Sequence, residues 1–168
     1  DRLKSRAARA ARGRARGGWA RGGAAHDRGE EARSLAVAAM QRASEMVQSL
    51  LKTTAAQQRT PYHPLCVNIL QLLLKEGLVR GYNVEGNRIT ILLKHYQGAP
   101  VIRQVRVVSK PSRDIWLLPH ELKFRTRFNT GLWVMQTPLG VVSHRDCIEM
   151  GLGGKVLFAV NNGYQHWC

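Results

Sequence analysis

Residues 140–160 read GVVSHRDCIEMGLGGKVLFAV, and the residues that begin and end its elements decide the fold of the C-terminal part of the chain. Ser143 is a good helix N-cap, and Asp146 three positions later can return a bond to the cap residue, as in a capping box. Gly151 is placed to end the helix, because glycine takes the left-handed conformation without a side-chain penalty. The stretch therefore predicts a strand, a short capped helix, and a turn into a second strand.

Gly153 and Gly154 make this turn unusual, because a glycine pair lets the backbone approach a neighbour very closely. Residues 156–160, VLFAV, have the apolar pattern of a buried strand. Two explanations for the pair are open. The neighbour can be a binding partner, or the glycines can simply close the connection between helix and strand, which is the more frequent reason for such turns.

The chain is strongly basic, with 26 Lys and Arg residues against 11 Asp and Glu among 168 residues, which gives a formal net charge of +15. Charge repulsion of this size is offset when a protein binds a polyanion, so nucleic acid is the leading candidate partner. The sequence has no run of about 18 apolar residues and therefore predicts no membrane span. The length and the ordinary apolar content of 44% allow one substantial domain or two small ones.

Residues 1–33 differ sharply from the rest, with ten basic and four acidic residues in an Arg, Ala and Gly background that cannot build a core. Three interpretations are open: an organelle presequence, a segment that lies along nucleic acid, and a solvated tail. We favour the first, and because the chain begins at Asp1 rather than Met we expect upstream sequence to have been removed or left out. The other residues carry sixteen basic and seven acidic side chains, so the body of the chain is itself basic.

The three cysteines are few and widely spaced, so they predict neither a disulfide framework nor a zinc site, and they indicate a reducing compartment. His144 and Cys147 are three positions apart, a spacing that suits a nucleophile with its base or half of a metal site. We interpret both as helix-surface residues, so no catalytic residue, metal, cofactor or small-molecule substrate is expected. A basic hydrolase or nuclease that uses this pair is the enzymatic alternative.

The N-terminal half alternates helical and extended patterns. From Ser34 onward apolar residues recur every three or four positions, which predicts an amphipathic helix. Residues 65–75 are apolar enough for a buried helix that ends before Gly77. The other predictions for this half are a polar connector over 52–60, strands over 78–84 and 88–93 joined by a turn at 85–87, and a chain break at 98–100.

The C-terminal half is patterned mostly as strands. Residues 101–108 alternate so that Val105 and Val107 share one face while Arg106 projects from the other. The other predictions for this half are a basic turn with Lys110 and Arg113, strands over 115–118 and 132–135, and a loop over 136–140. If the segment between these strands is extended, it places Lys123, Arg125 and Arg127 on one side, as phosphate contacts or as an exposed edge.

Four stretches carry a resemblance to a known family: LLKEGLV at 73–79, LLKHYQGAPVI at 92–102, RVVSKPSRDIW at 106–116 and GVVSHRDCIEMGLGGKVLFAV at 140–160. Together they resemble the S8 family of small-subunit ribosomal proteins, in the order of that family and without large gaps over about 35–160. The most specific parts are the VSKP loop and the helix that ends in GLGG.

The resemblance implies an α+β protein with two small domains: an N-terminal α/β sandwich-like domain over 34–100, and a C-terminal, mostly antiparallel β domain with one short helix over 101–160. A basic extension, 1–33, and a short tail, 161–168, flank them. It implies a structural constituent of the small ribosomal subunit that binds the central domain of small-subunit rRNA and meets neighbouring ribosomal proteins. A free-standing RNA-binding regulator is an alternative. The basic extension and the divergent loop described next favour a mitochondrial ribosome, with a plastid or the bacterial cytoplasm as alternatives.

In the family, a Ser- and Thr-rich loop of the form STSKG and the glycine turn before the last strand contact the RNA. Here the loop reads QTPLG and retains only Thr137 and Gly140, and Lys155 stands where the family commonly has an acidic residue. Tyr62 can stack on a base or pack at a helix start, and His63 can touch phosphate. The residues expected to bind rRNA are Tyr62, His63, Lys110, Arg113, Gln136, Thr137, Gly140, Ser143, Arg145, Gly153, Gly154 and Lys155.

Overall fold

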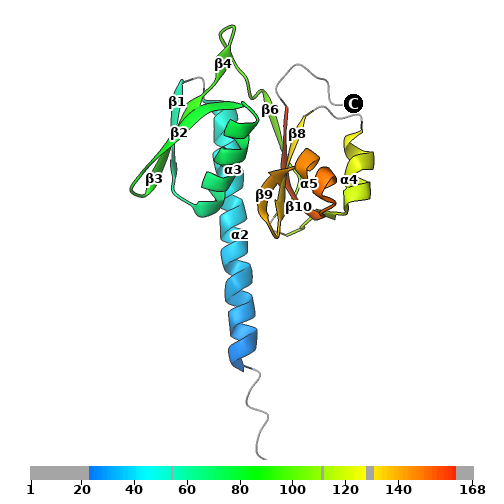
Figure 1. Cartoon of the computed structure of the whole chain (residues 1–168). Coiled ribbons are helices and arrows are strands. Elements are labelled where there is room, and N and C mark those ends of the chain that lie inside the picture. Colours follow the sequence, from blue (N-terminus) through cyan, green and yellow to red (C-terminus); the bar gives the residue numbers. More distant parts are fainter. Residues whose placement is uncertain (1–22, 54, 111, 128–130, 162–168) are drawn as a thin grey trace, which may run out of the picture. The chain divides into compact units, whose positions relative to one another are not determined.

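The computed structural model describes residues 23–53, 55–110, 112–127 and 131–161, with side chains from Arg28 onward. The chain divides after Ala36 into two units, and every described sheet belongs to the second unit. The described residues form four helices, a three-stranded sheet, a five-stranded sheet and a two-stranded hairpin (Figure 1). The predicted α+β class with a β-rich C-terminal part is therefore confirmed.

Helix α2 (Gly23–Lys52) begins well before Ser34, where we predicted its start. Residues 28–36 are exposed and rich in Ala, Glu and Arg, which favour a helix without needing an apolar stripe. The stripe therefore marks only the part of α2 that is buried, and Leu35 at its predicted beginning is exposed. The buried residues of α2 are Met40, Ala43, Met46, Val47 and Leu50.

The three-stranded sheet has the order β1-β3-β2 and is antiparallel throughout. β2 (Val79–Glu85) and β3 (Arg88–Leu93) form the predicted hairpin, whose turn places Gly86 at φ 57°. β1 (Gln57–Pro61) lies in the segment that we predicted to be a polar connector, so that prediction was wrong. Only Thr60 of β1 is buried, so apolar burial does little to hold this strand. Its backbone pairing with β3 holds it at the sheet edge.

Helix α3 (Pro64–Lys75) confirms the buried helix to within one residue of its predicted start. Pro64 stands in the first turn, where its missing N–H costs little. The side chain of His63 caps the helix, since its Nδ1 accepts a hydrogen bond from the Leu65 N–H at 3.1 Å. The buried residues of α3 are Cys66, Ile69, Leu70, Leu72 and Leu73.

β10 (Gly154–Asn161) is the central strand of the five-stranded sheet (Figure 1). β8 (Leu132–Thr137) pairs along one of its edges, and β9 (Gly140–Ser143) pairs with β8 as the outer strand of a hairpin. β7 (Trp116–Leu117) and β6 (Gln104–Val107) pair with successive parts of its other edge. β10 therefore brings segments from across the C-terminal half together.

Helix α4 (Pro119–Thr126) occupies the segment whose cations would share one side if it were extended. Pro119 begins the helix, and the Glu121 carboxylate accepts a hydrogen bond from the Leu118 N–H at 3.0 Å, which satisfies an amide at the helix start. Successive helical residues are about 100° apart around the axis, so alternate residues do not share a side. Lys123 and Arg125 therefore do not share a side, and the row of three cations that an extended segment would give does not form.

The capped helix of the opening segment is confirmed as α5 (His144–Met150). The Ser143 hydroxyl oxygen accepts a hydrogen bond from the Asp146 N–H at 3.2 Å, and Gly151 ends the helix at φ 65°. The loop predicted over 136–140 is instead a tight hairpin, because β8 and β9 extend into it from both sides.

A short hairpin of β4 (His95–Tyr96) and β5 (Ala99–Pro100) stands where we predicted only a chain break. Its turn places both Gln97 and Gly98 at positive φ, 52° and 78°. The strand after it is shorter than predicted, because β6 covers only four residues, but Arg106 projects from it as an exposed side chain as expected.

Buried apolar side chains form two clusters in the described part of the chain. The first includes residues from both halves, among them Ile69 and Phe158, so the predicted division into two domains at residue 100 stays a prediction. The second lies between the C-terminal sheet and helices α4 and α5, and includes Leu122 and Cys147. The described residues contain neither a helix suited to crossing a bilayer nor a group of three or more potential metal ligands.

Candidate nucleic-acid interface

The glycine turn has its close neighbour inside the protein. A Cβ at position 154 would lie 2.7 Å from the backbone oxygen of Gln136 and 3.0 Å from Cγ2 of Thr137. A Cβ at position 153 would lie 3.0 Å from the backbone oxygen of Leu117. Both glycines therefore let β10 begin tightly packed between β7 and β8. This accounts for the close approach by chain packing alone, and direct RNA contact by the two glycines stays a prediction.

Three side chains lie in one row across the sheet beside this turn. Lys155 on β10 is directly opposite Gln136 on β8 and directly opposite Trp116 on β7. Directly paired residues of an antiparallel sheet project from the same face, with their Cβ atoms about 5 Å apart. Gln136 and Trp116 are both exposed, and Trp116 is 64% exposed. The row therefore presents an amide, an ammonium and an indole side by side.

Trp116 is the residue that sequence reasoning missed. We placed it only in the short strand over 115–118. Its position between a basic turn and Pro119 could have indicated an exposed aromatic side chain. Lys155, which we expected to favour phosphate, is paired within the chain: its Nζ lies 2.6 Å from Oδ1 of Asp114, and its side chain is 13% exposed. The ion pair holds the ammonium in place beside the indole, and a phosphate would have to share it with the carboxylate.

The basic turn with Lys110 and Arg113 is anchored next to the same row. The two residues exchange backbone hydrogen bonds of 3.1 and 2.9 Å. The buried Ser109 hydroxyl accepts from the Ile115 N–H at 3.0 Å, and the Ile115 oxygen accepts from the Val156 N–H at 2.9 Å. These bonds attach the turn to the first residues of β10. Lys110 and Arg113 are both exposed there, as the prediction of a phosphate contact requires.

The β8–β9 turn uses its predicted RNA-binding residues mainly to build itself. Thr137 is buried, and its hydroxyl donates to the Gly140 carbonyl at 3.0 Å. Gly140 has a φ of 117°, which favours glycine. Leu139 at the tip is 72% exposed. Of the residues in this turn that we predicted to bind RNA, Gln136 has an exposed polar side chain that a partner could reach.

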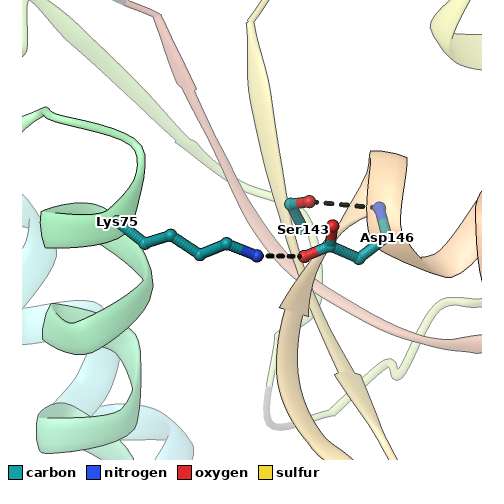
Figure 2. A network of polar contacts seen from close by, with 3 residues as sticks. All are labelled: Lys75, Ser143 and Asp146. Carbon is teal, nitrogen blue, oxygen red and sulfur yellow. Dashed lines mark hydrogen bonds and ion pairs between the residues drawn. The ribbon is translucent and has the colours of Figure 1, made fainter.

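Ser143 and Asp146 hold the start of α5 and connect it to α3 (Figure 2). Ser143 is fully buried, so a contact between its side chain and RNA would require the helix start to open. Lys75 Nζ lies 3.1 Å from Oδ2 of Asp146. Burial acts to raise the pKa of Asp146, but hydrogen bonds from Lys75 and from the Ser143 hydroxyl and amide outweigh it and hold this pKa below its ordinary value. Arg145, on the first turn of α5, is exposed.

Tyr62 and His63 lie at the start of α3 rather than beside the glycine turn. The Tyr62 N–H donates to the Asn87 carbonyl at 3.0 Å, so this segment is attached to the β2–β3 turn. The Tyr62 side chain is 38% exposed. His63 uses one ring nitrogen as the helix cap, and its predicted phosphate contact would have to use the other. The structure therefore brings Gln136, Lys155 and the basic turn together, and it places Ser143 and Arg145 at the start of α5 and Tyr62 and His63 at the start of α3.

A sequence profile of the family described as Ribosomal protein S8 matches residues 41–161. The chain belongs to this family. Among curated relatives, the small ribosomal subunit protein uS8 of Rhodospirillum centenum is 38% identical over 106 residues, which cover 60% of this chain and 80% of the relative. The small ribosomal subunit protein uS8m of Acanthamoeba castellanii is 33% identical over 99 residues, which cover 58% of this chain and 78% of the relative. The matched region contains the whole row of Trp116, Gln136 and Lys155.

His144 and Cys147 are core residues of this S8 family chain, not the helix-surface residues that we predicted. His144 is 5% exposed and Cys147 is fully buried. The Nδ1 of His144 accepts a hydrogen bond from the Trp133 N–H at 3.1 Å, so this nitrogen is not available as a base. Burial, together with the nearby Asp146 carboxylate, raises the pKa of the Cys147 thiol to about 11. The pair therefore packs α5 on β8 and lacks the activated thiolate that the enzymatic alternative needs.

His144 should make folding stability depend on pH. Burial lowers the pKa of His144 below its ordinary value near 6.5, and the adjacent Arg145 lowers it further. Below about pH 6.5 the histidine is protonated in the unfolded chain but stays neutral in the folded chain. The free energy of unfolding is therefore highest above about pH 6.5 and falls as the pH drops below it, by up to about 1.4 kcal/mol per pH unit. Urea unfolding between pH 7 and pH 5 measures this. His144→Asn, which keeps an acceptor but does not titrate, should flatten the curve; equal slopes for both proteins would contradict the prediction.

Proposed function

We propose that this chain is a constituent of the small ribosomal subunit that binds small-subunit rRNA directly through the surface around its glycine turn. The observation that carries the proposal is the row of Gln136, Lys155 and Trp116, with the basic turn anchored to its end. Single-stranded or distorted RNA offers unstacked bases to aromatic side chains and phosphates to cations. The row and the turn supply both kinds of group within a few residues.

Each group has a distinct part in this binding. Trp116 stacks on an exposed base, and Gln136 bonds to a base edge or a sugar hydroxyl. Lys110 and Arg113 neutralise phosphates and set the position of the protein along the RNA. Lys155, held by Asp114, keeps the row in place. No covalent step is involved, and binding holds RNA segments together so that other ribosomal proteins can join.

The mitochondrial ribosome is the proposed location. The relative named uS8m supports it, as does the Arg- and Ala-rich extension, whereas the bacterial relatives fit the alternative of the bacterial cytoplasm. Imaging of a tagged full-length chain tests the location, and a purely cytosolic distribution would contradict it. Sedimentation of the same chain separates a ribosomal constituent, which travels with the small subunit, from a free-standing regulator, which stays near the top of the gradient.

Trp116→Ala should weaken binding to a transcript of the small-subunit rRNA central domain from the same organism. Loss of one stacked base costs about 1–2 kcal/mol, which is roughly a 5- to 30-fold increase in Kd. A filter-binding titration at constant salt measures the effect. Trp116→Tyr should retain most of the affinity, because a tyrosine still offers a ring face.

Phe124→Ala is the matched control, since Phe124 is an aromatic side chain of the same half that is 78% exposed but lies on α4, outside the row. This variant should bind RNA like the unchanged protein. If Trp116→Ala and Phe124→Ala have the same affinity as the unchanged protein, the proposed surface is wrong.

A further inference from the structure

A cavity of about 500 Å³ opens at one end of the three-stranded sheet, in the N-terminal half and away from the row that contains Trp116. It lies where β1 and β2 begin and β3 ends. Three of its lining residues carry basic side chains, and none of its described lining residues is acidic. The lining residues are Ala56, Val79, Arg80, Leu93, Lys94 and His95.

A β-bulge and a backbone hydrogen bond shape the wall of the cavity. The pairing of β2 with β3 shifts between Val79 and Gly81, so Arg80 is the extra residue of a β-bulge. Bulges re-aim side chains and are frequent beside functional sites. The Leu93 N–H donates to the Ala56 carbonyl at 2.9 Å and ties the start of β1 to the end of β3.

Lys94 is held in position by two further bonds. Its Nζ donates to the Gly77 carbonyl at 3.1 Å, which leaves two ammonium hydrogens for another acceptor. Its own carbonyl accepts from the Val101 N–H at 2.9 Å, which fixes the base of the β4–β5 hairpin and with it His95. A guanidinium, an ammonium and an imidazole thus line one opening, and the described residues that line it include no carboxylate.

We propose that this cavity binds a phosphate group of an RNA backbone, as a second contact separate from the glycine-turn surface. The affinity for phosphate follows from the three basic side chains, since Arg and Lys bind phosphate through charge-assisted hydrogen bonds. The choice of RNA as the source of the phosphate rests on the proposed function. With two contact points in different halves, the chain spans two RNA segments.

The first test measures the salt dependence of RNA binding. Loss of one phosphate contact flattens the slope of log K against log salt by about one and weakens binding about fivefold near 0.15 M salt. Arg80→Gln combined with Lys94→Gln should therefore weaken binding to the rRNA central-domain transcript about fivefold and flatten the slope by about one, because the two side chains share one phosphate. Arg80→Lys combined with Lys94→Arg should retain binding, because both charges are kept.

Arg88→Gln is the matched control, because Arg88 is an exposed arginine at the opposite end of the same sheet. Thermal unfolding of all variants confirms that each is folded. If the Arg80 and Lys94 double variant binds RNA no more weakly than Arg88→Gln, the inference is overturned, while the proposed function stands on the Trp116 result.

The second test separates the two sources of phosphate by the amide NMR shifts of Arg80, Lys94 and His95 in the full chain. Saturable shifts with the transcript support the inference, whether or not inorganic phosphate also produces them. Shifts with inorganic phosphate alone overturn the assignment to RNA, and no shift with either overturns the site. A chain that binds no rRNA at all would contradict the proposed function, and the inorganic phosphate titration would still decide whether the cavity takes phosphate.

Discussion

Phe158→Ala is expected to lower the free energy of unfolding by about 3–5 kcal/mol, the usual cost of truncating a fully buried phenylalanine. Phe158 lies in the central strand β10, directly opposite Val134 on β8 and Val107 on β6. Its side chain is fully buried and belongs to the apolar cluster with residues from both halves. Truncation removes apolar contacts and leaves a cavity that the paired strands on both sides cannot easily fill.

Phe124→Ala is the matched control, because the same atoms are removed from a side chain that is 78% exposed on α4. Its unfolding free energy should change by no more than about 0.5 kcal/mol. Urea unfolding followed by circular dichroism measures both variants. A loss of less than about 1 kcal/mol for Phe158→Ala would mean that β10 is not the centre of the core.

Helix-capping residues and turn glycines made much of this fold predictable from the sequence. Ser143 and Gly151 bound α5 because a cap hydroxyl and a left-handed glycine act on their own neighbours. Gly86 likewise marks the β2–β3 hairpin. Each of these signals works within a few residues, so no knowledge of the rest of the chain is needed to interpret it.

The elements that were wrong depend on distant partners or on weak local signals. β1 has one buried residue, and only its pairing with β3, some thirty residues later in the chain, makes it a strand. In α4 the alternating cations suggested an extended segment, but Pro119 and the Glu121 bond to the Leu118 N–H start a helix there. The early start of α2 was missed because its exposed residues carry no apolar pattern.

The candidate site was predictable in part for the same reason. Lys110 and Arg113 were proposed from their own charges beside a turn, and Gln136 from the likeness of its loop to the family's RNA-binding loop. All three are exposed, as an RNA contact requires, and the contact itself stays a prediction. Trp116 was not predicted as a site residue, because its place in the row depends on pairing with β10, which sets it beside Lys155. His144 and Cys147 were placed on the surface because a seven-residue helix shows too little periodicity to reveal its buried face.

Gly154→Ala should destabilise the fold by about 3 kcal/mol, the upper end of the usual cost of adding a methyl group to a packed site. The new Cβ would lie 2.7 Å from the Gln136 backbone oxygen, and this oxygen belongs to the paired strand β8 and cannot turn aside. The strands must therefore separate where β10 begins. Chemical denaturation measures the loss. Gly29→Ala, an exposed helical position with nothing within 4 Å, is the control and should be neutral or stabilising by up to about 1 kcal/mol.

The same variant separates the two explanations for the glycine turn. If Gly154 is glycine because the protein backbone is close, Gly154→Ala loses stability, and its RNA affinity falls only as far as the separated strands disturb Gln136 and Trp116. If it is glycine because RNA comes close, the unfolding free energy is unchanged and RNA affinity alone falls. The 2.7 Å approach to Gln136 favours the first outcome. Under the proposed function the glycine serves RNA binding indirectly, because it allows β7, β10 and β8 to pack closely enough to set Trp116, Lys155 and Gln136 in one row.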